Sequence, residues 1–208
     1  MRYTLALLII LVGCGGGDDG GNAPIDAPMP PPIDGPPPAF VGRWRELPFA
    51  KGPTPEEDRL VLTITASGSI TAQAPGLLRV ARWELTPDDR LAITEGNSTV
   101  IDAYYVSADR FVIGALLPVG DVDGVVGTWR SVQTSGGGDI TSTMTLGADQ
   151  RASYTWLGGP ANYQLEGTWA LSGDELLITG EVGGMAQERW FQVVPDAAIG
   201  YPVHERLP

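Results

Sequence analysis

The 208-residue chain has very few residues of the types on which disulfides and nucleophilic catalysis depend. Cys14 is its only cysteine and His204 its only histidine. A single thiol excludes an intramolecular disulfide and a thiolate metal cluster, and the sequence has no Gly-x-Ser-x-Gly elbow. His204 is followed by Glu205 and Arg206, and we expect it at the surface of a terminal strand. We therefore predict no catalytic residues and a protein that is not an enzyme.

Positive charge is also scarce. The chain has 13 lysine and arginine residues against 25 aspartate and glutamate residues, for a formal net charge of −12. Lys51 is the only lysine, and the arginines form no block. Because nucleic acids and anionic lipid surfaces are bound through clustered positive charge, we expect no nucleic-acid partner.

Metal and cofactor motifs are incomplete. Asp121–Gly124 (DVDG) begins like a calcium loop but lacks the closing glutamate. Residues 136–139 (GGGD) lack the Lys-Ser/Thr of a phosphate loop. We therefore predict no metal and no cofactor. An enzymatic role stays a residual alternative, because Glu84, Glu166 and Glu188 could meet in space as acid and base.

The sequence has no apolar run long enough for a membrane-spanning helix. Its longest run, Tyr3–Val12, is about half of the roughly 20 residues that a helix needs to cross a bilayer. Met1 and Arg2 precede it as a positive region, which is typical of a signal peptide. The tetrapeptide that follows, Leu11-Val12-Gly13-Cys14, resembles the bacterial lipobox.

The lipobox resemblance implies a lipid anchor. In proteins with this motif the leader, here residues 1–13, is removed, the cysteine thiol takes a diacylglyceryl group, and the new N-terminus is acylated, with palmitate as the expected chain. Cys14 is therefore the predicted lipidation site. Gly15 replaces the aspartate that retains such proteins at the inner membrane, so the resemblance implies the outer membrane, facing the periplasm or the exterior. The alternative is a buried cysteine in an uncleaved apolar helix.

Residues 14–38 contain almost only Gly, Pro, Asp and Ala after the cysteine. Such a composition offers little apolar surface to offset the entropy of ordering. The triplets Pro30–Pro32 and Pro36–Pro38 favour extended polyproline II, which rises about 3.1 Å per residue. We predict a disordered linker that holds a folded part away from the bilayer.

Beyond Phe40 the sequence alternates apolar and polar residues in short runs. In NYQLEGTWALS, Tyr163, Leu165, Trp169 and Leu171 share one parity, which is typical of a half-buried strand. Similar runs are separated by turn residues such as Gly96-Asn97 and Ser172-Gly173-Asp174. No segment has a helical apolar stripe. We predict an all-β protein.

The alternating region also repeats itself. VGRW at Val41–Trp44 matches VGTW at Val126–Trp129, and ARWELTPDDRLAIT from Ala81 matches GTWALSGDELLITG from Gly167. A third block, YYVSADRFVIG, matches WFQVVPDAAIG. The three pairs of blocks occur in the same order and at nearly constant spacing. We predict two copies, residues 39–123 and 124–208.

Each copy resembles the short lipocalin-like domains of bacterial lipoproteins, which begin with Gly-x-Trp and contain Gly-x-Trp-x-Leu-x-Gly-Asp-x-Leu. The second copy carries that motif as GTWALSGDEL at Gly167–Leu176. The first copy departs from it at Ala81, at Pro87-Asp88 and at Arg79, which lies on the inward parity. The resemblance implies two tandem small antiparallel β-meanders or barrels, with four tryptophans packed inside: Trp44, Trp83, Trp129 and Trp169.

Two functional hypotheses follow. In the first, a lipid-anchored envelope protein binds a small apolar ligand or an envelope component, and Arg79 is the candidate ligand-binding residue. A buried guanidinium must be paired, so an inward Arg79 requires an acidic neighbour or an anionic ligand; the alternative is an exposed Arg79. In the second hypothesis, the barrels are solid and a surface recruits a partner protein.

Overall fold

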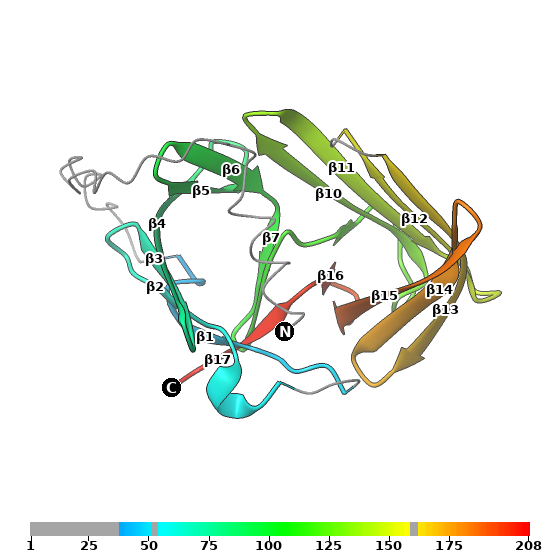
Figure 1. The fold of residues 1–208 in the computed structure, drawn as a ribbon, viewed down its shortest axis with the longest axis horizontal. Coiled ribbons are helices and arrows are strands. Elements are labelled where there is room, and N and C mark those ends of the chain that lie inside the picture. The colour runs from blue at the N-terminus through cyan, green and yellow to red at the C-terminus, as the bar shows by residue number, and fades with distance from the viewer. Residues whose placement is uncertain (1–37, 51–53, 159–161) are drawn as a thin grey trace.

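A computed structural model describes residues 38–50, 54–158 and 162–208 (Figure 1). The predicted leader, the predicted lipidation site Cys14 and nearly all of the predicted linker lie outside the described residues. The described strands are antiparallel and form one large sheet that is not closed into a barrel. The all-β prediction is therefore confirmed.

The first half of the described chain contains nine strands and one short 3₁₀ turn, η1 (Glu56–Asp58). The strands are β1 (Gly42–Glu46), β2 (Val61–Ile64), β3 (Ser69–Ala74), β4 (Leu77–Leu85), β5 (Leu91–Glu95), β6 (Ser98–Asp102), β7 (Tyr104–Val106), β8 (Arg110–Ile113) and β9 (Leu117–Pro118).

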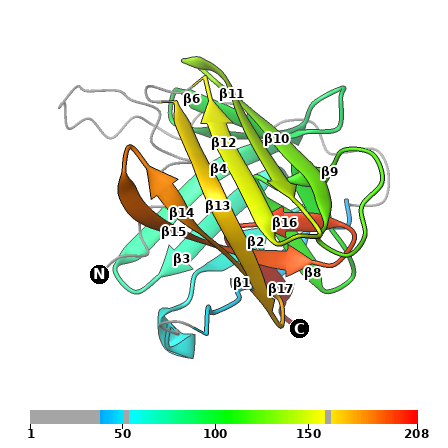
Figure 2. The same cartoon turned by 90° about the vertical axis from the view of Figure 1, so that its right-hand side faces the viewer.

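The second half contains eight strands, which are on average longer. They are β10 (Gly127–Ser135), β11 (Gly138–Leu146), β12 (Arg151–Leu157), β13 (Tyr163–Ser172), β14 (Glu175–Val182), β15 (Met185–Val194), β16 (Ala198–Gly200) and β17 (Val203–Arg206). Figure 2 shows β11, β12 and β13 lying side by side across this half.

The alternation and the turn residues explain these strands. In β2 the burial alternates, with Leu62 and Ile64 inside and their neighbours half-buried. Gly96 has a φ of +58° and, with Asn97, joins β5 to β6 in a two-residue turn. A left-handed backbone is the conformation that glycine adopts without steric cost. The predicted turn at Ser172-Gly173-Asp174 likewise joins β13 to β14.

The buried side chains form two main hydrophobic clusters. The first runs from Phe40 to Ile113 and contains Trp44 and Trp83. The second runs from Leu116 to Ile199 and contains Trp129, with Trp169 packed against it. The prediction that these four tryptophans pack in cores is confirmed. A small third cluster of Val112, Ala115, Ala198 and Val203 lies between the two.

The two halves exchange their last strands. β17, from the second half, pairs with β1 and β8 of the first half. Conversely, β9 pairs with β10 of the second half, and the adjacent Leu116 bridges to Ile199 of β16. Strand pairing therefore crosses the predicted boundary at residues 123 and 124, and the division into two tandem domains stays a prediction.

Equivalent tryptophans make equivalent hydrogen bonds in the two halves. The indole of Trp44 donates to the carbonyl of Phe40 (2.7 Å), and that of Trp129 donates to Val125 (2.9 Å), in both cases four residues earlier. The backbone N–H of Trp83 donates to the Gly68 carbonyl in the β2–β3 turn, and that of Trp169 donates to the Gln150 carbonyl in the equivalent β11–β12 turn. The sequence similarity therefore has a counterpart in local geometry.

Candidate ligand-binding face

The inward side of the second half is layered. Toward one end, the inward positions of β10 to β15 carry large apolar side chains that are almost completely buried. They are Trp129, Met144, Leu146, Leu165, Leu176, Ile178 and Phe191. This layer is filled by the protein's own side chains, as expected of a close-packed core.

Several other inward positions on β11 to β15 are different, because they carry aromatic or polar side chains. These side chains are only partly buried, except for that of Arg189, which is exposed, and two of them lie beside the packed layer: Tyr154 opposite Leu165, and Arg189 opposite Ile178. We call the set Ser142, Tyr154, Trp156, Tyr163 and Arg189 the aromatic face. The strand register places Ser142 opposite Trp156 and Trp156 opposite Tyr163, so these side chains lie on one side of neighbouring strands.

The rings of the aromatic face are in contact. The Tyr154 and Tyr163 centroids are 6.0 Å apart, and Tyr154 packs edge-on against Phe191 at 5.3 Å. Arg189 holds its guanidinium carbon 4.9 Å from the Tyr163 ring centroid, and its Nε donates to the Tyr163 hydroxyl (3.2 Å). Burial raises the pKa of the Tyr154 phenol, and Ser142 and Arg189 partly offset that effect.

Two glycines on this inward side explain how Arg189 of β15 reaches Tyr163 of β13. A Cβ placed on Gly167 would lie 2.0 Å from the Thr179 carbonyl oxygen. A Cβ on Gly180 would lie 2.2 Å from the carbonyl oxygen of Glu166. β13 and β14 therefore approach more closely than any other residue would allow, and the sheet bends tightly between Tyr163 and Arg189.

In the first half, the structure places Arg79 on the inward parity of β4, which it shares with the buried Ala81 and Trp83. Its guanidinium is half-buried and pairs with Glu95, whose two carboxylate oxygens lie 3.1 and 3.2 Å from Nη1. The alternative, in which the local register differs and Arg79 is exposed, does not describe this partly buried, inward position. The expected acidic neighbour is present, and the role of Arg79 as a ligand-binding residue stays a prediction.

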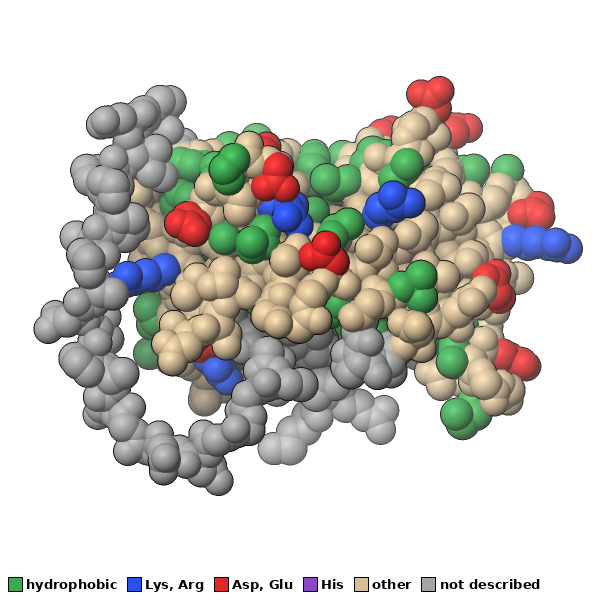
Figure 3. Space-filling view, turned by 90° about the horizontal axis from the view of Figure 1, so that it is seen from above, with side chains coloured by type: hydrophobic (Ala, Val, Ile, Leu, Met, Phe, Trp, Pro, Cys, Tyr) green, Lys and Arg blue, Asp and Glu red, His purple; other side chains and the backbone are tan. Residues whose placement is uncertain are grey.

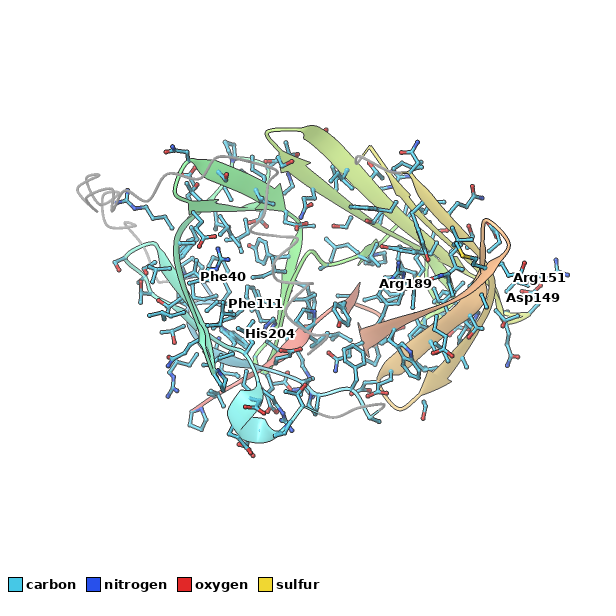
Figure 4. All side chains as sticks on the ribbon, in the orientation of Figure 1. Phe40, Phe111, Asp149, Arg151, Arg189 and His204 are labelled. Carbon is cyan, nitrogen blue, oxygen red and sulfur yellow. The ribbon has the colours of Figure 1, made fainter. Side chains whose placement is uncertain are left out.

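His204 is not a surface residue, contrary to our expectation. Only 1% of it is exposed, and its two ring nitrogens have no hydrogen-bond partner among the described residues. It is buried because β17 lies between β1 and β8, which places its ring 6.3 Å from Phe111 in the first core. Burial lowers the pKa of His204 to about 4. Figure 4 shows Phe40, Phe111 and His204 together in this half, with Arg189 in the other.

Two buried polar side chains join the halves. Asp102 of β6 accepts hydrogen bonds from Gln133 (2.9 Å) and Ser131 (3.4 Å) of β10, and burial raises its pKa to about 6. Gln192 of β15 donates to the carbonyls of Leu47 and Pro48 and accepts from the Val203 N–H (3.0 Å). Each is satisfied only when both halves are in place.

The other sequence candidates do not assemble into a site. Within residues 38–50, 54–158 and 162–208, no group of three or more His, Cys, Asp or Glu side chains is placed to hold a metal ion. In the DVDG segment, the Gly124 N–H donates to Asp196. Glu166 is exposed and bonds to Ser153 and Gln164. Among the described helices, none is long and apolar enough to cross a membrane.

Comparison with known proteins found no match: no family model, no curated protein and no solved structure is similar to this chain. The aromatic face was not anticipated from the sequence either. A signal for it exists, since Arg189 shares its parity with Phe191 and Val193, and Tyr163 shares its parity with Leu165.

Proposed function

We propose that the protein is a non-enzymatic, lipid-anchored protein of the bacterial cell envelope that binds a small apolar ligand or an apolar envelope component. The observation that carries the binding role is the aromatic face: three aromatic rings stay partly exposed on an inward surface whose neighbouring layer is closely packed. Aromatic side chains at such positions offer large apolar area to a ligand.

The anchoring part of the proposal depends on Cys14 and the preceding Leu11-Val12-Gly13. Two or three acyl chains hold a protein stably at a bilayer, because each buried methylene contributes about 0.8 kcal/mol. The linker over residues 14–38 would then separate the folded part from the outer membrane. The lysine and arginine side chains lie apart from one another on the face in Figure 3, so this face offers no basic cluster for direct membrane binding.

The finer description of the fold belongs to the same proposal. We propose that the chain contains two copies of a short lipocalin-like unit, at residues 39–123 and 124–208. The equivalent indole hydrogen bonds of Trp44 and Trp129 support this duplication. The separate clusters of apolar side chains in the two halves also support it.

Binding is tested with the neutral fluorophore N-phenyl-1-naphthylamine on the full chain carrying Cys14→Ser, which cannot be acylated. We expect saturable fluorescence enhancement that Trp156→Ala weakens about fivefold or more, because one ring of the aromatic face is lost. Leu78→Ala is the matched control, since Leu78 is 67% exposed on the outward side of β4. Absence of saturable binding would remove the binding role.

Anchoring is tested separately by comparing the wild-type chain with Cys14→Ser in cells. We expect the wild type to incorporate labelled palmitate and to fractionate with the outer membrane, and the variant to do neither. Unchanged membrane fractionation of the variant would contradict the anchor.

A structural or interaction module is the second candidate. It is favoured by one observation: β4 extends beyond β5, whose pairing with it begins at Arg82, so residues 77–81 are hydrogen-bonded to β3 alone in the ladder. Leu78 and Val80 are exposed there. Crosslinking in the envelope that Leu78→Asp abolishes, together with no ligand binding, would favour this candidate.

A further inference from the structure

The arginines of the described chain differ in what neutralises them. In an acidic protein most inward or partly buried guanidinium groups find a carboxylate, as Arg79 does with Glu95 and Arg45 with Glu205. Arg189 forms no ion pair within the described residues, although it lies on an inward parity. Its contacts there are with the ring and hydroxyl of Tyr163.

The geometry of this contact leaves the terminal amino groups of the Arg189 guanidinium able to bind an anion. Nε of Arg189 is used by the Tyr163 hydroxyl, while the two terminal amino groups make no hydrogen bond to a described residue. These two groups form the planar fork that binds a carboxylate, phosphate or sulfonate through two parallel hydrogen bonds. The ring beneath the guanidinium holds it over the aromatic face.

The surroundings of Arg189 define the rest of a ligand. Tyr154, Trp156 and Tyr163 provide adjacent aromatic surface, which an apolar or planar body would cover. A free inorganic anion would leave that surface uncovered, and a neutral apolar molecule would leave the guanidinium without a counter-charge.

Building on the proposed function, we infer that the ligand of the aromatic face is an amphipathic anion, with an acidic group bound by Arg189 and an apolar body on Tyr154, Trp156 and Tyr163. The acidic group is a carboxylate, phosphate or sulfonate. The body is an acyl chain or an aromatic ring system, and both share the chemistry that this face recognises.

A pair of matched probes tests the inference on the full chain carrying Cys14→Ser. 1-Anilinonaphthalene-8-sulfonate carries the same aromatic skeleton as N-phenyl-1-naphthylamine plus one sulfonate. We expect the anionic probe to bind about tenfold more tightly. Arg189→Gln should reduce the ratio of the two affinities to about one, whatever its effect on the neutral probe alone, and Arg189→Lys should retain part of the preference.

Arg151→Gln is the control, because Arg151 is an exposed arginine at the start of β12, beside Asp149 and remote from Arg189 (Figure 4). It should change neither probe's affinity. Urea midpoints of all variants show whether each is folded, and Arg189→Lys keeps the test valid if Arg189→Gln does not fold. Two carboxylates then compete with bound 1-anilinonaphthalene-8-sulfonate. Displacement of this probe by dodecanoate but not by 1-naphthoate identifies an acyl body, and displacement by 1-naphthoate alone identifies an aromatic one.

The outcomes separate the inference from the proposed function. If the neutral probe binds in a Trp156-dependent manner and Arg189→Gln leaves the anionic probe unaffected, the anionic ligand is wrong and the binding role stands. If neither probe binds the wild-type sequence saturably, both are wrong. If both acids displace the probe equally from Arg189→Gln and from wild type, Arg189 is not the anion site.

Discussion

The two halves of the molecule share one pattern of strand pairing, but they differ in the charged side chains on the inward face of the sheet. Trp83 pairs with Ile93 in the first half, and Trp169 pairs with Ile178 in the second. Moving from these pairs toward the same end, the first half places Arg79 and Glu95 on the inward side, as an ion pair.

At the equivalent positions the second half has the fully buried Leu165 and the side-chain-free Gly180. Its inward charge is instead Arg189, which has no carboxylate partner among the described residues. The comparison teaches that one half neutralises its inward arginine with a carboxylate of the same half, while the other half offers its inward arginine an aromatic ring and a hydroxyl instead.

The largest expected effect comes from removing the exchanged strand. Deleting residues 202–208 removes β17, leaves β1 and β8 without their shared neighbour, and leaves the Gln192 side chain without its Val203 donor. We expect loss of most of the free energy of unfolding, which is about 5–15 kcal/mol for a folded domain. Urea denaturation followed by circular dichroism measures it.

Deleting Pro208 alone is the control for this truncation, because Pro208 lies beyond the Leu207 N–H that bonds to Arg43. Adding a synthetic peptide of residues 202–208 should restore part of the lost stability. A truncated chain that unfolds like the wild type would show that the halves do not depend on the exchange.

The next effect compares the two equivalent tryptophans. Trp44 and Trp129 are both fully buried and both donate from the indole to a carbonyl four residues earlier. Trp44→Ala and Trp129→Ala should each cost about 3–5 kcal/mol. Trp44 also has the Arg206 guanidinium 4.4 Å from its ring, so its replacement should cost slightly more. Costs that differ severalfold would break the equivalence of the halves.

The pH dependence of the free energy of unfolding tests two buried titratable groups, His204 of β17 and Asp102 of β6. Their contributions change in opposite directions with pH. The pKa of His204 falls to about 4 in the folded state, so its contribution reduces stability as the pH drops from 6.5 toward 4. The pKa of Asp102 rises to about 6, so its contribution reduces stability as the pH rises from 3.8 toward 6. Each effect is roughly 3 kcal/mol at most, and because the two oppose each other the stability of the wild type should change little with pH in this window.

Replacing one of the two groups at a time should make the pH dependence of the other visible in the stability. In His204→Phe, stability should fall as the pH rises through this window, and in Asp102→Asn it should rise. Glu46, whose pKa burial also raises, adds to the Asp102 direction. Urea midpoints at half-unit pH steps between 4 and 7 measure both variants, and parallel curves for the two would contradict the opposition.

The smallest expected effect concerns the Arg79–Glu95 pair. About a third of the Arg79 side chain and a fifth of the Glu95 side chain are exposed, so solvent screens the attraction. Glu95→Gln should cost about 0.2–1 kcal/mol. The same substitution removes the carboxylate that neutralises Arg79. The first half should therefore gain affinity for anions, which can be measured with 1-anilinonaphthalene-8-sulfonate. No gain of anion binding would show that the ion pair does not account for the difference between the halves.

The sequence allowed the all-β fold, the turns and the buried tryptophans to be predicted, because alternation reports which face of a strand is buried. It could not report which strands are neighbours. The reciprocal exchange of β9 and β17 therefore went unpredicted, and the wrong expectation for His204 followed directly from it, since a strand at the end of the chain looks like an edge until its two partners are known.

The same limit applies to the candidate site. Parity placed Arg79 on the inward side, yet only the three-dimensional register showed that Glu95 reaches it. Arg189 was equally accessible to a parity argument. Its meeting with Tyr163 depends on the close approach of Gly167 and Gly180, which lie opposite each other on two consecutive strands and are 13 positions apart in sequence.

The order in which the chain leaves the ribosome gives the exchanged strand a further importance. β17 follows every other described strand, so the first half is synthesised long before the segment that lies between β1 and β8 exists. Its native packing must wait until nearly all of the polypeptide has emerged. A chain built in this way leaves the facing edges of β1 and β8 unpaired until its synthesis is nearly complete.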